Sequence, residues 1–355
     1  MKRILTLLLL MFLFVNCISE NKKNNKSEIV NNTKQKTKQK TKQVKSNNKQ
    51  KVGENTYVDL LKRTKKYADN LDFNLDYIRK KGLADKKYLA EFLGMYLKIN
   101  KALKSKSDKE SIRKRLEPFY KETLKKGFHN MATVNDKLFK KNSMSYMRIM
   151  WLLDQLGFDI SFYKKELEKV QKRMDNHMKI RGEWQKAVFD FYYDYFNIKK
   201  PSVLKNAKKL KGAIGTRKNL VFYNRQQAYV LTHFVFAAYD YGNKHTQTRF
   251  NDDDIKYLKT ILSQIISKFE LKRNDDLVGE LLTCQVLIGD TKTAAFKKSY
   301  KRLMSRQNLD GSFGAYEAYR KKVGNDAEFR AYLHTTLVCF ETFVEFEDRK
   351  SVFGN

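Results

Sequence analysis

Five polar residues on predicted apolar helices are the first candidates for chemistry: His233, Asp240, Glu280, Cys284 and His334. His233 and Asp240 are seven residues apart and share one helix face, whereas Glu280 and Cys284 are four apart and form one stripe. Titratable groups on apolar helices need partners, because their burial alone costs free energy. Histidine, thiolate and carboxylate are sensible zinc ligands, and three of them would leave an open catalytic position.

The same residues also fit a hydrogen-bonded polar network within a core. A single histidine on an apolar helix is usually such a core residue, and a lone cysteine behaves as a small hydrophobe. Asp276 extends the stripe of Glu280 and Cys284, but no close-spaced Cys-x-x-Cys or His-x-x-x-His pair anchors the set. No phosphate-binding loop or nucleophile elbow occurs either. The sequence therefore supports both a cavity site and a core network.

The elements that position these residues are predicted to be helices. Proline and glycine are sparse, and apolar residues recur at spacings of three and four over long windows, which is the helix period. No alternating strand with a hairpin turn is found, so the fold class is all-α. The expected helices span residues 55–72, 74–82, 86–104, 108–126, 133–156, 160–180, 183–198, 201–212, 221–241, 252–270, 275–289, 292–306 and 328–347.

Several residues predict how individual helices begin or break. Pro118 is expected to kink or split the helix at 108–126, and Pro201 suits the first turn of a helix. Ser107 has a glutamate three residues later, which is the spacing of a capping box. The acidic segment that follows Asn251 is typical of a helix start, because acids there complement the helix dipole.

Glycines punctuate the chain in a way that predicts stacked helical hairpins. Gly157, Gly242 and Gly289 each follow an apolar helix. Gly157 and Gly242 are 85 residues apart and Gly242 and Gly289 are 47 apart, which is close to two helical hairpins and one helical hairpin of about 45 residues each. The segments 146–157 and 187–198 are apolar nearly all round, so each is expected to pack on several sides. We therefore expect an α/α toroid, a ring or arc of paired helical hairpins.

The N-terminal segment predicts export and attachment to a membrane. A short basic start precedes an apolar run at residues 4–15, which is typical of a secretory signal and too short to span a bilayer. We assign residues 1–16 to a signal peptide. Cys17 directly after the apolar run resembles the lipobox of bacterial lipoproteins, although Phe14 and Asn16 depart from it, and this resemblance implies lipid attachment at Cys17, with ordinary cleavage as the alternative. Residues 17–52, rich in Lys, Gln, Thr and Asn, are predicted to form a disordered tether. Residues 53–355 remain for the helical domain.

Charge and cysteine content narrow the class of partner. The net charge is +34, but the lysines are spread through every predicted helix and do not form one stripe, so nucleic acid is not the expected partner. In an exported protein, an anionic envelope polymer or lipid is the expected attraction. Cys284 and Cys339 are the only cysteines besides Cys17. They imply no disulfide framework, and both are expected to be free thiols.

One motif resembles a known superfamily. Residues 307–314 read Gln-Asn-Leu-Asp-Gly-Ser-Phe-Gly, which resembles the Gln-x-x-Asp-Gly-Ser-(Trp/Phe)-Gly signature of the squalene cyclase and protein prenyltransferase superfamily. The resemblance covers only residues 220 to 345 and looks like a poorly characterised, lipoprotein-type bacterial branch. It implies an α/α toroid, with the signature in a loop that ties helices together. Further segments that carry the resemblance are 232–233, 239–242, 276–282 and 332–338.

The resemblance implies a fold but departs from the family at its active sites. The segment 251–254 reads Asn-Asp-Asp-Asp and lacks the first carboxylate of the cyclase acid motif, so we interpret it as a helix N-terminus. Protein prenyltransferases bind zinc through Asp, Cys and His. By that resemblance His233, Cys284 and His334 are the tentative zinc ligands, with Asp276 or Glu280 as alternatives.

Three functional hypotheses follow from the sequence. The leading one is an envelope lipoprotein whose toroid cavity binds a ligand or substrate, with zinc as the candidate cofactor and no particular reaction implied. The second is a non-catalytic helical-repeat interaction module of the cell envelope. The third is a secreted carbohydrate-active lyase or hydrolase, which would require two facing carboxylates. The three hypotheses differ in the side chains that they place together at the cavity, so the structure of the cavity decides among them.

Overall fold

The computed structural model describes residues 56–350 apart from 72, 74, 82–84 and 315–331. The predicted signal peptide, the predicted lipid-attachment residue Cys17 and the whole predicted tether therefore lie outside the described residues. Every regular element in the described part is helical, and it contains no strand, which confirms the all-α prediction. None of the described helices is long and apolar enough to cross a lipid bilayer.

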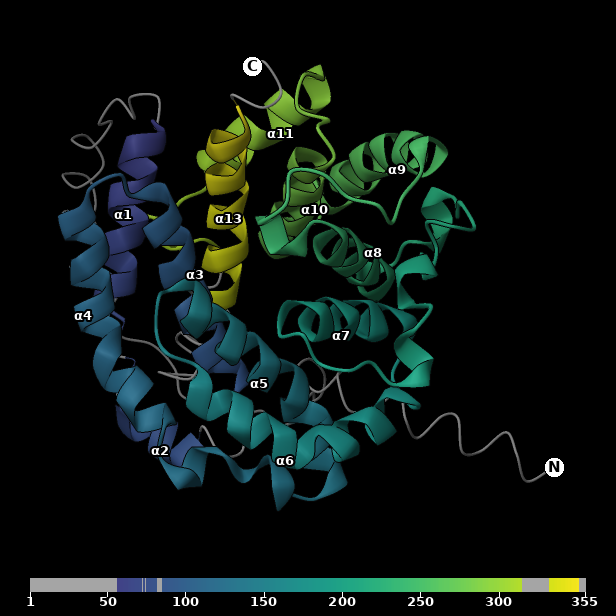
Figure 1. The fold of residues 1–355 in the computed structure, drawn as a ribbon. Coiled ribbons are helices and arrows are strands. Elements are labelled where there is room, and N and C mark those ends of the chain that lie inside the picture. Colours follow the sequence, from purple (N-terminus) through teal and green to yellow (C-terminus); the bar gives the residue numbers. More distant parts are fainter. Residues whose placement is uncertain (1–55, 72, 74, 82–84, 315–331, 351–355) are drawn as a thin grey trace, which may run out of the picture. The chain divides into compact units, whose positions relative to one another are not determined.

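Twelve α-helices occur in the described residues, and short 3-10 turns connect several of them (Figure 1). The helices are α1 (Tyr57–Asp69), α2 (Leu75–Lys81), α3 (Lys87–Ala102), α4 (Lys106–Thr123), α5 (Asp136–Gln155), α6 (Ser161–Met178), α7 (Glu183–Tyr195), α8 (Arg225–Ala238), α9 (Asp252–Glu270), α10 (Asp275–Leu287), α11 (Ala294–Met304) and α13 (His334–Arg349).

Six of these helices contact one another in a regular order. α3 packs against α5, α5 against α7, α7 against α8, α8 against α10, and α10 against α13, while α13 also contacts α3. The other helices are called here the outer helices: α4 packs on α3, α6 on α5, α9 and α11 on α10, α1 on both α3 and α13, and α2 on α4. Figure 1 shows α4, α6, α9 and α11 at the periphery of the view.

The burial of the six helices follows from their sequences. Every residue of α10 is buried, and α5 and α7 bury the apolar segments near 146–153 and 187–193 that the sequence marks as apolar nearly all round. A helix without a polar face needs neighbours on several sides, and the six-helix set provides them. The outer helices instead bury one stripe each, as α6 does with Leu167, Val170 and Met174.

Three expectations about local structure are wrong. Residues 201–212 do not form one helix but contain the 3-10 turns η3 (Ser202–Leu204) and η4 (Ala207–Lys209). The Arg249 side chain donates hydrogen bonds to the carbonyls of Ala207 and Leu210, at 2.6 and 3.2 Å. The Ala207 carbonyl also accepts the Leu210 backbone N–H at 3.0 Å, so short 3-10 bonds and the Arg249 side chain together satisfy this segment in place of α-helical bonds.

The other two corrections concern α4. The helix is continuous through Pro118, which is exposed, so the carbonyl that loses its partner there faces water. The helix also begins earlier than expected, because Ser105 and not Ser107 is the N-cap. The Ser105 hydroxyl accepts a hydrogen bond from the Asp108 backbone N–H at 3.4 Å.

Other predicted signals are confirmed. Asn251 caps α9 in a full capping box with Asp254. Gly157, Gly242 and Gly289 all adopt positive φ angles, between 73° and 94°, which are the left-handed conformations expected after a helix.

The loop at residues 307–314 joins three helices. It follows α11, and the Gln307 amide donates to the Thr64 hydroxyl of α1 at 2.9 Å. The Phe313 backbone N–H donates to the Thr336 hydroxyl of α13 at 2.9 Å. At Gly311 a Cβ would lie only 2.1 Å from the Arg63 carbonyl oxygen, so the loop can approach α1 only with glycine there.

Candidate metal centre

The candidate site is built from the first turns of four helices in the six-helix set. α10 is the central one, because it packs against both α8 and α13, and α13 in turn packs against α3. His334 is the first residue of α13, and Asp276 and Glu280 lie one turn apart near the start of α10. α3 contributes Lys87 and Glu91, and α8 contributes Arg225, Tyr229 and Thr232.

A close approach of α10 and α13 sets the distance between their side chains. A Cβ on Gly279 would lie 3.0 Å from the Cys339 Cα, so glycine lets the two backbones nearly touch. The hydroxyl of Thr342 on α13 donates to the Gly279 carbonyl at 2.9 Å, and the Thr283 hydroxyl donates to the same oxygen at 3.0 Å. This close contact between α10 and α13 holds His334 opposite Asp276 and Glu280.

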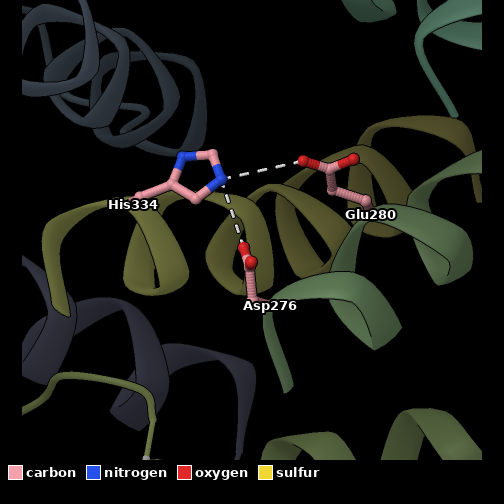
Figure 2. A group of neighbouring side chains, drawn as sticks. All are labelled: Asp276, Glu280 and His334. Atoms are coloured by element: carbon pink, nitrogen blue, oxygen red, sulfur yellow. Dashed lines mark ion pairs between the residues drawn. The ribbon is translucent and has the colours of Figure 1, made fainter. Parts of the chain in front are cut away.

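His334 is the centre of the site, with a carboxylate on each side of its ring. Its Nδ1 lies 3.0 Å from Glu91 Oε1. Its Nε2 lies 3.2 Å from Asp276 Oδ1 and 3.8 Å from Glu280 Oε1 (Figure 2). Three carboxyl groups therefore face one imidazole, and the ligand atoms of Asp276, Glu280 and His334 all lie within 4.8 Å of one another.

The second oxygen of each α10 carboxylate is held by a hydroxyl from α8. The Tyr229 hydroxyl donates to Asp276 Oδ2, and the Thr232 hydroxyl donates to Glu280 Oε2 at 2.6 Å. The Arg225 guanidinium adds charge at 3.7 Å from the same Asp276 oxygen. These bonds fix both carboxylates so that their remaining oxygens point at His334 Nε2.

The site is buried at its base and open on one side. The Glu91 side chain is 1% exposed, and those of Asp276 and Glu280 are 8% and 3% exposed. His334 keeps 24% of its side-chain surface, while Lys87, which lies 3.3 Å from Glu91, keeps 59%. Water or a ligand can therefore reach the imidazole without displacing a core residue.

The charges of the cluster shift one another's pKa values. Burial alone would raise the pKa of Glu91, but Lys87, His334 and Arg148 lower it to about 2. Burial would likewise lower the pKa of His334, yet Asp276 and Glu91 raise it to about 10. When no metal ion is bound, the His334 imidazole is therefore protonated and positively charged.

Asp276 and Glu280 respond in opposite directions. Burial works against ionisation of Asp276, but His334 and the Tyr229 hydroxyl lower its pKa. Burial and the neighbouring Asp276 charge raise the pKa of Glu280 to about 7. Two carboxyl groups this close do not both ionise easily, so the pair retains a proton that a metal cation could displace.

His233, a residue proposed from the sequence, lies beside this cluster but not in it. Its Nδ1 donates to the Tyr229 carbonyl at 2.7 Å, and its ring packs edge-on against Trp184 at 4.8 Å. Burial lowers the pKa of His233 to about 4, although the hydrogen bond to the Tyr229 carbonyl by itself would raise it. His233 is therefore a neutral imidazole with its proton on Nδ1.

Cys284 and Asp240 lie apart from His334. Cys284 is eight residues beyond Asp276 on α10, a rise of about 12 Å, and its thiol is directed at the Thr232 carbonyl at 3.9 Å. Burial raises its pKa well above the usual range, so it is a neutral thiol. Asp240 lies in η6 (Asp240–Gly242), where it pairs with Lys244 at 2.5 Å.

Asp240 lines a separate cavity of about 410 Å³ between the ends of α7 and α8. Asp190 and Arg249 line the same cavity, 3.6 Å apart, and Asp194 there is paired with Lys208. The acids and bases around this cavity already neutralise one another. It contains none of the residues that face His334, so we assign the chemistry to the His334 cluster.

Glu91 and Lys87 were not recognised in the sequence. Glu91 occupies an otherwise apolar stretch of α3 between Ala90 and Phe92, both fully buried. A carboxylate in such a stretch is the same signal that singled out Glu280. Applying it to the helix predicted at residues 86–104 would have found Glu91.

The arrangement resembles a metal centre more than a simple ion pair. His334 Nε2, Asp276 Oδ1 and Glu280 Oε1 are one nitrogen and two oxygens, a ligand set that suits zinc and related divalent ions. The Nδ1 side of the ring faces Glu91, as a histidine ligand usually faces a carboxylate that orients it. Three protein ligands leave coordination positions for water or a substrate atom.

Comparison with known proteins gives a family and no function. The model of a family described as a domain of unknown function (DUF6895) matches residues 66–341, and this range includes the whole His334 cluster. No curated protein and no solved structure matches the chain. Since the match covers well over half of the sequence, the chain belongs to the DUF6895 family.

Proposed function

We propose that this protein is a lipid-anchored envelope protein whose helical domain binds a divalent metal, zinc first among the candidates, at Asp276, Glu280 and His334. The metal would face a ligand or substrate inside an α/α toroid. One observation carries the proposal: three ligand atoms from two helices converge on one point, and a second group orients each of them from behind.

The distances suit a metal ion. Ligand atoms about 2.1 Å from a tetrahedral zinc lie about 3.4 Å from one another. His334 Nε2 lies 3.2 and 3.8 Å from the oxygens of Asp276 and Glu280, so small side-chain movements would complete the coordination. Glu91, Tyr229 and Thr232 would remain as the groups that orient the three ligands.

Several atoms of the cluster are not satisfied by the protein itself. Both oxygens of Glu91, Oδ1 of Asp276 and Nδ1 of His334 are buried and lack a hydrogen bond of good geometry among the described residues, although Glu91 and Asp276 form ion pairs with His334. Apart from His334, the cations that face the three carboxyl groups are largely exposed, Lys87 at 59% and Arg225 at 66%. Burial of such a cluster is unfavourable, and a divalent cation would relieve it.

The order of helix contacts supports the toroid. Six helices contact one another in sequence, and the last of them, α13, contacts the first, α3. From α3 onward the outer helices alternate with them along the chain, as expected for stacked hairpins, except that only 3-10 turns separate α7 from α8. The lipid anchor rests on Cys17, which directly follows the apolar run, and a Cys17→Ser substitution that leaves membrane association unchanged would contradict it.

Metal analysis tests the proposal directly. The full chain, purified after exposure to zinc and dialysed, should retain about one equivalent of zinc. His334→Ala and Asp276→Asn should each lose it, because each removes one of three ligands. His245→Ala is the matched control, since His245 is an exposed histidine outside the cluster, and it should keep the metal.

A second readout is thermal stability. Zinc that binds only the folded protein must raise the melting temperature of the wild type and of His245→Ala, but not that of His334→Ala. If all three proteins respond alike, or if none retains metal, the cluster is a polar network of the core. That result would favour the non-catalytic interaction module.

The carbohydrate-active alternative has less support. A glycosidase needs two carboxyl groups that face each other across the scissile bond. Asp276 and Glu280 lie on one helix and converge on the same imidazole, and the His334 ring lies between them and Glu91.

A further inference from the structure

Arg148 on α5 is the one arginine of the six-helix interior that the described residues leave without a partner. It is half-buried, and its Nε is fully shielded from solvent. Its guanidinium makes no hydrogen bond and no ion pair with any described residue. A guanidinium has five donors and keeps its charge at every physiological pH, so such a position is costly.

Other buried arginines in the described part are paired. Arg249 donates to two carbonyls and lies 3.6 Å from Asp190, and Arg181 donates to Ser143 and to the Lys140 carbonyl. Arg349, at 1% exposure, donates to two carbonyls and lies 3.6 Å from Glu345. These three buried arginines are thus bonded, whereas the half-buried Arg63 on α1 resembles Arg148, because its shielded Nε and Nη2 make no hydrogen bond among the described residues. What distinguishes Arg148 is its place on α5, within the six-helix set that also carries the His334 cluster.

The Arg148 guanidinium lies against Gly94 of α3. Its Nη2 lies 3.4 Å from the point where a Cβ on Gly94 would sit, so the glycine on α3 leaves room for the guanidinium. Its charge also lowers the pKa of Glu91 on α3 and of His233 on α8. Gly94 lies one helical turn beyond Glu91 on α3, so the Arg148 guanidinium contacts α3 next to the turn that carries Glu91 of the His334 cluster.

Aromatic side chains lie near the same space. One helical turn beyond Arg148, the Trp151 ring lies 5.8 Å from Phe191 and 5.9 Å from Tyr241. The Arg148 charge acts on Tyr241 as well. The Trp151 Nε1 donor is buried and makes no hydrogen bond with any described residue. A ligand there would meet a cation, a spare N–H donor and flat apolar rings.

We propose that Arg148 binds an oxyanion, the carboxylate or phosphate group of a small organic ligand that also reaches the metal at His334. This inference deepens the proposed function, because it names the ligand class of the same site. The planar fork of an arginine matches both oxyanions through two parallel hydrogen bonds. Lys87, exposed at the mouth of the cluster, would attract the same anion from solution.

Glu91 does not serve as the partner of Arg148. The Glu91 carboxylate already faces Lys87 at 3.3 Å and His334 at 3.0 Å, and no ion pair within 4.0 Å joins it to Arg148. The cation and the acidic cluster thus sit near each other without cancelling. Such an arrangement fits a ligand with an anionic end for Arg148 and a neutral or donor group for the metal.

The test uses Arg148→Met in the full chain, with inorganic phosphate and acetate as probes at matched ionic strength. Without either anion, Arg148→Met should melt at the same temperature as wild type or higher, because an unpaired charge is removed. With phosphate or acetate the wild type should gain stability and the variant should not. Calorimetry should show at least about a tenfold loss of affinity in the variant.

The controls separate this inference from the metal proposal. Arg217→Met removes an exposed arginine and should leave anion binding unchanged. If wild type and Arg148→Met bind both anions equally, or if wild type binds neither, the assignment of Arg148 is wrong. If anion binding depends on Arg148 while His334→Ala and wild type alike retain no zinc, the anion site stands and the metal site fails. The stronger of the two anions indicates whether the ligand carries phosphate or carboxylate.

Discussion

Helices α3 and α13 carry two buried charged clusters, one near each end, and the two clusters are built differently. Near the N-terminal ends, Glu91 and His334 belong to the His334 cluster with Asp276 and Glu280. Near the C-terminal ends, a second group, called here the closed cluster, joins the same two helices. Its members are Lys98, Lys101, Glu341, Glu345 and Asp348.

The closed cluster pairs its charges inside the protein, where two lysines face three carboxylates and the buried Arg349, 3.6 Å from Glu345, supplies the third positive charge. Lys98 lies 2.7 Å from Glu341 and 2.9 Å from Glu345, and Lys101 lies 3.0 Å from Glu345. Lys98 also donates to the Tyr241 carbonyl at 3.2 Å. Although burial opposes it, the two lysines keep the pKa of Glu345 below its usual value. Every charge meets an opposite charge, so this cluster needs no further ligand.

The His334 cluster is neutralised differently. Its three carboxyl groups face the His334 imidazolium and two largely exposed cations, Lys87 at 59% and Arg225 at 66% exposure. Two sets of ionisable groups on the same pair of helices thus differ in how exposed the cations are that neutralise them. The comparison suggests that the closed cluster serves stability, whereas the His334 cluster sacrifices some stability for binding.

The largest effect is expected from breaking the closed cluster. Glu345→Gln would leave Lys98 and Lys101 buried with one carboxylate fewer, which should lower the free energy of unfolding by about 3–5 kcal/mol. Urea denaturation followed by circular dichroism would measure this. Glu117→Gln, on the exposed face of α4, is the matched control and should change stability by less than about 0.5 kcal/mol.

The contrast between the clusters was only partly predictable from sequence. Helical periodicity located the elements well: the helix expected at 252–270 is α9 (Asp252–Glu270). It failed at 201–212, where the Arg249 side chain, distant in sequence, replaces helical hydrogen bonds. A local pattern carries no information about a partner that arrives from another helix.

The same limit applies to the site. Asp276, Glu280 and His334 were candidates because each is a titratable residue on an apolar helix. Their convergence depends on Gly279, whose missing side chain brings α13 against α10. The association of His334 with Glu91 depends on contact between α3 and α13, which lie far apart in the sequence. Helix spacing placed Cys284 on the stripe of Glu280 but could not show where that stripe leaves the site.

Lys86, at the N-cap of α3, is a buried cation that belongs to neither of the two clusters. Its ammonium group donates to the Phe128 carbonyl at 2.8 Å and lies 3.9 Å from the Phe128 ring centre. Burial lowers its pKa to about 7, far below the value of about 10.4 in an unfolded chain. Between these two values the unfolded state holds more protons than the native state, so stability must rise with pH.

Lys86→Met should remove this rise. The free energy of unfolding of the wild type should increase by up to about 1.4 kcal/mol per pH unit between pH 7 and 10, relative to the variant. Urea titrations at several pH values give the difference between the two curves. Lys256→Met, at an exposed position, should follow the wild type. Parallel curves for wild type and Lys86→Met would mean that Lys86 stays charged in the folded protein.

The smallest loss of stability, and the sharpest contrast, is expected for Glu280→Gln. The substitution is the same as at Glu345, and both side chains are buried. The two carboxyl groups nevertheless differ in pKa. Burial and the Asp276 charge raise the pKa of Glu280, whereas Lys98 and Lys101 lower the pKa of Glu345. Between about pH 4.3, the unfolded value, and about pH 7, native Glu280 holds its proton more tightly, so wild-type stability falls as pH rises.

Glutamine cannot ionise and its amide oxygen can still accept the Thr232 hydrogen bond, so metal-free Glu280→Gln should be about as stable as wild type near pH 4. It should be clearly more stable at pH 8, because the wild type loses up to about 1.4 kcal/mol per pH unit between about pH 4.3 and 7. Denaturation of both proteins with a chelator present measures this, and zinc should stabilise the wild type far more than the variant. If Glu280→Gln destabilised the metal-free protein as much as Glu345→Gln, the His334 cluster would be a second closed network. The case for a metal ligand at Glu280 would then fail, because the protein alone would already satisfy that carboxylate.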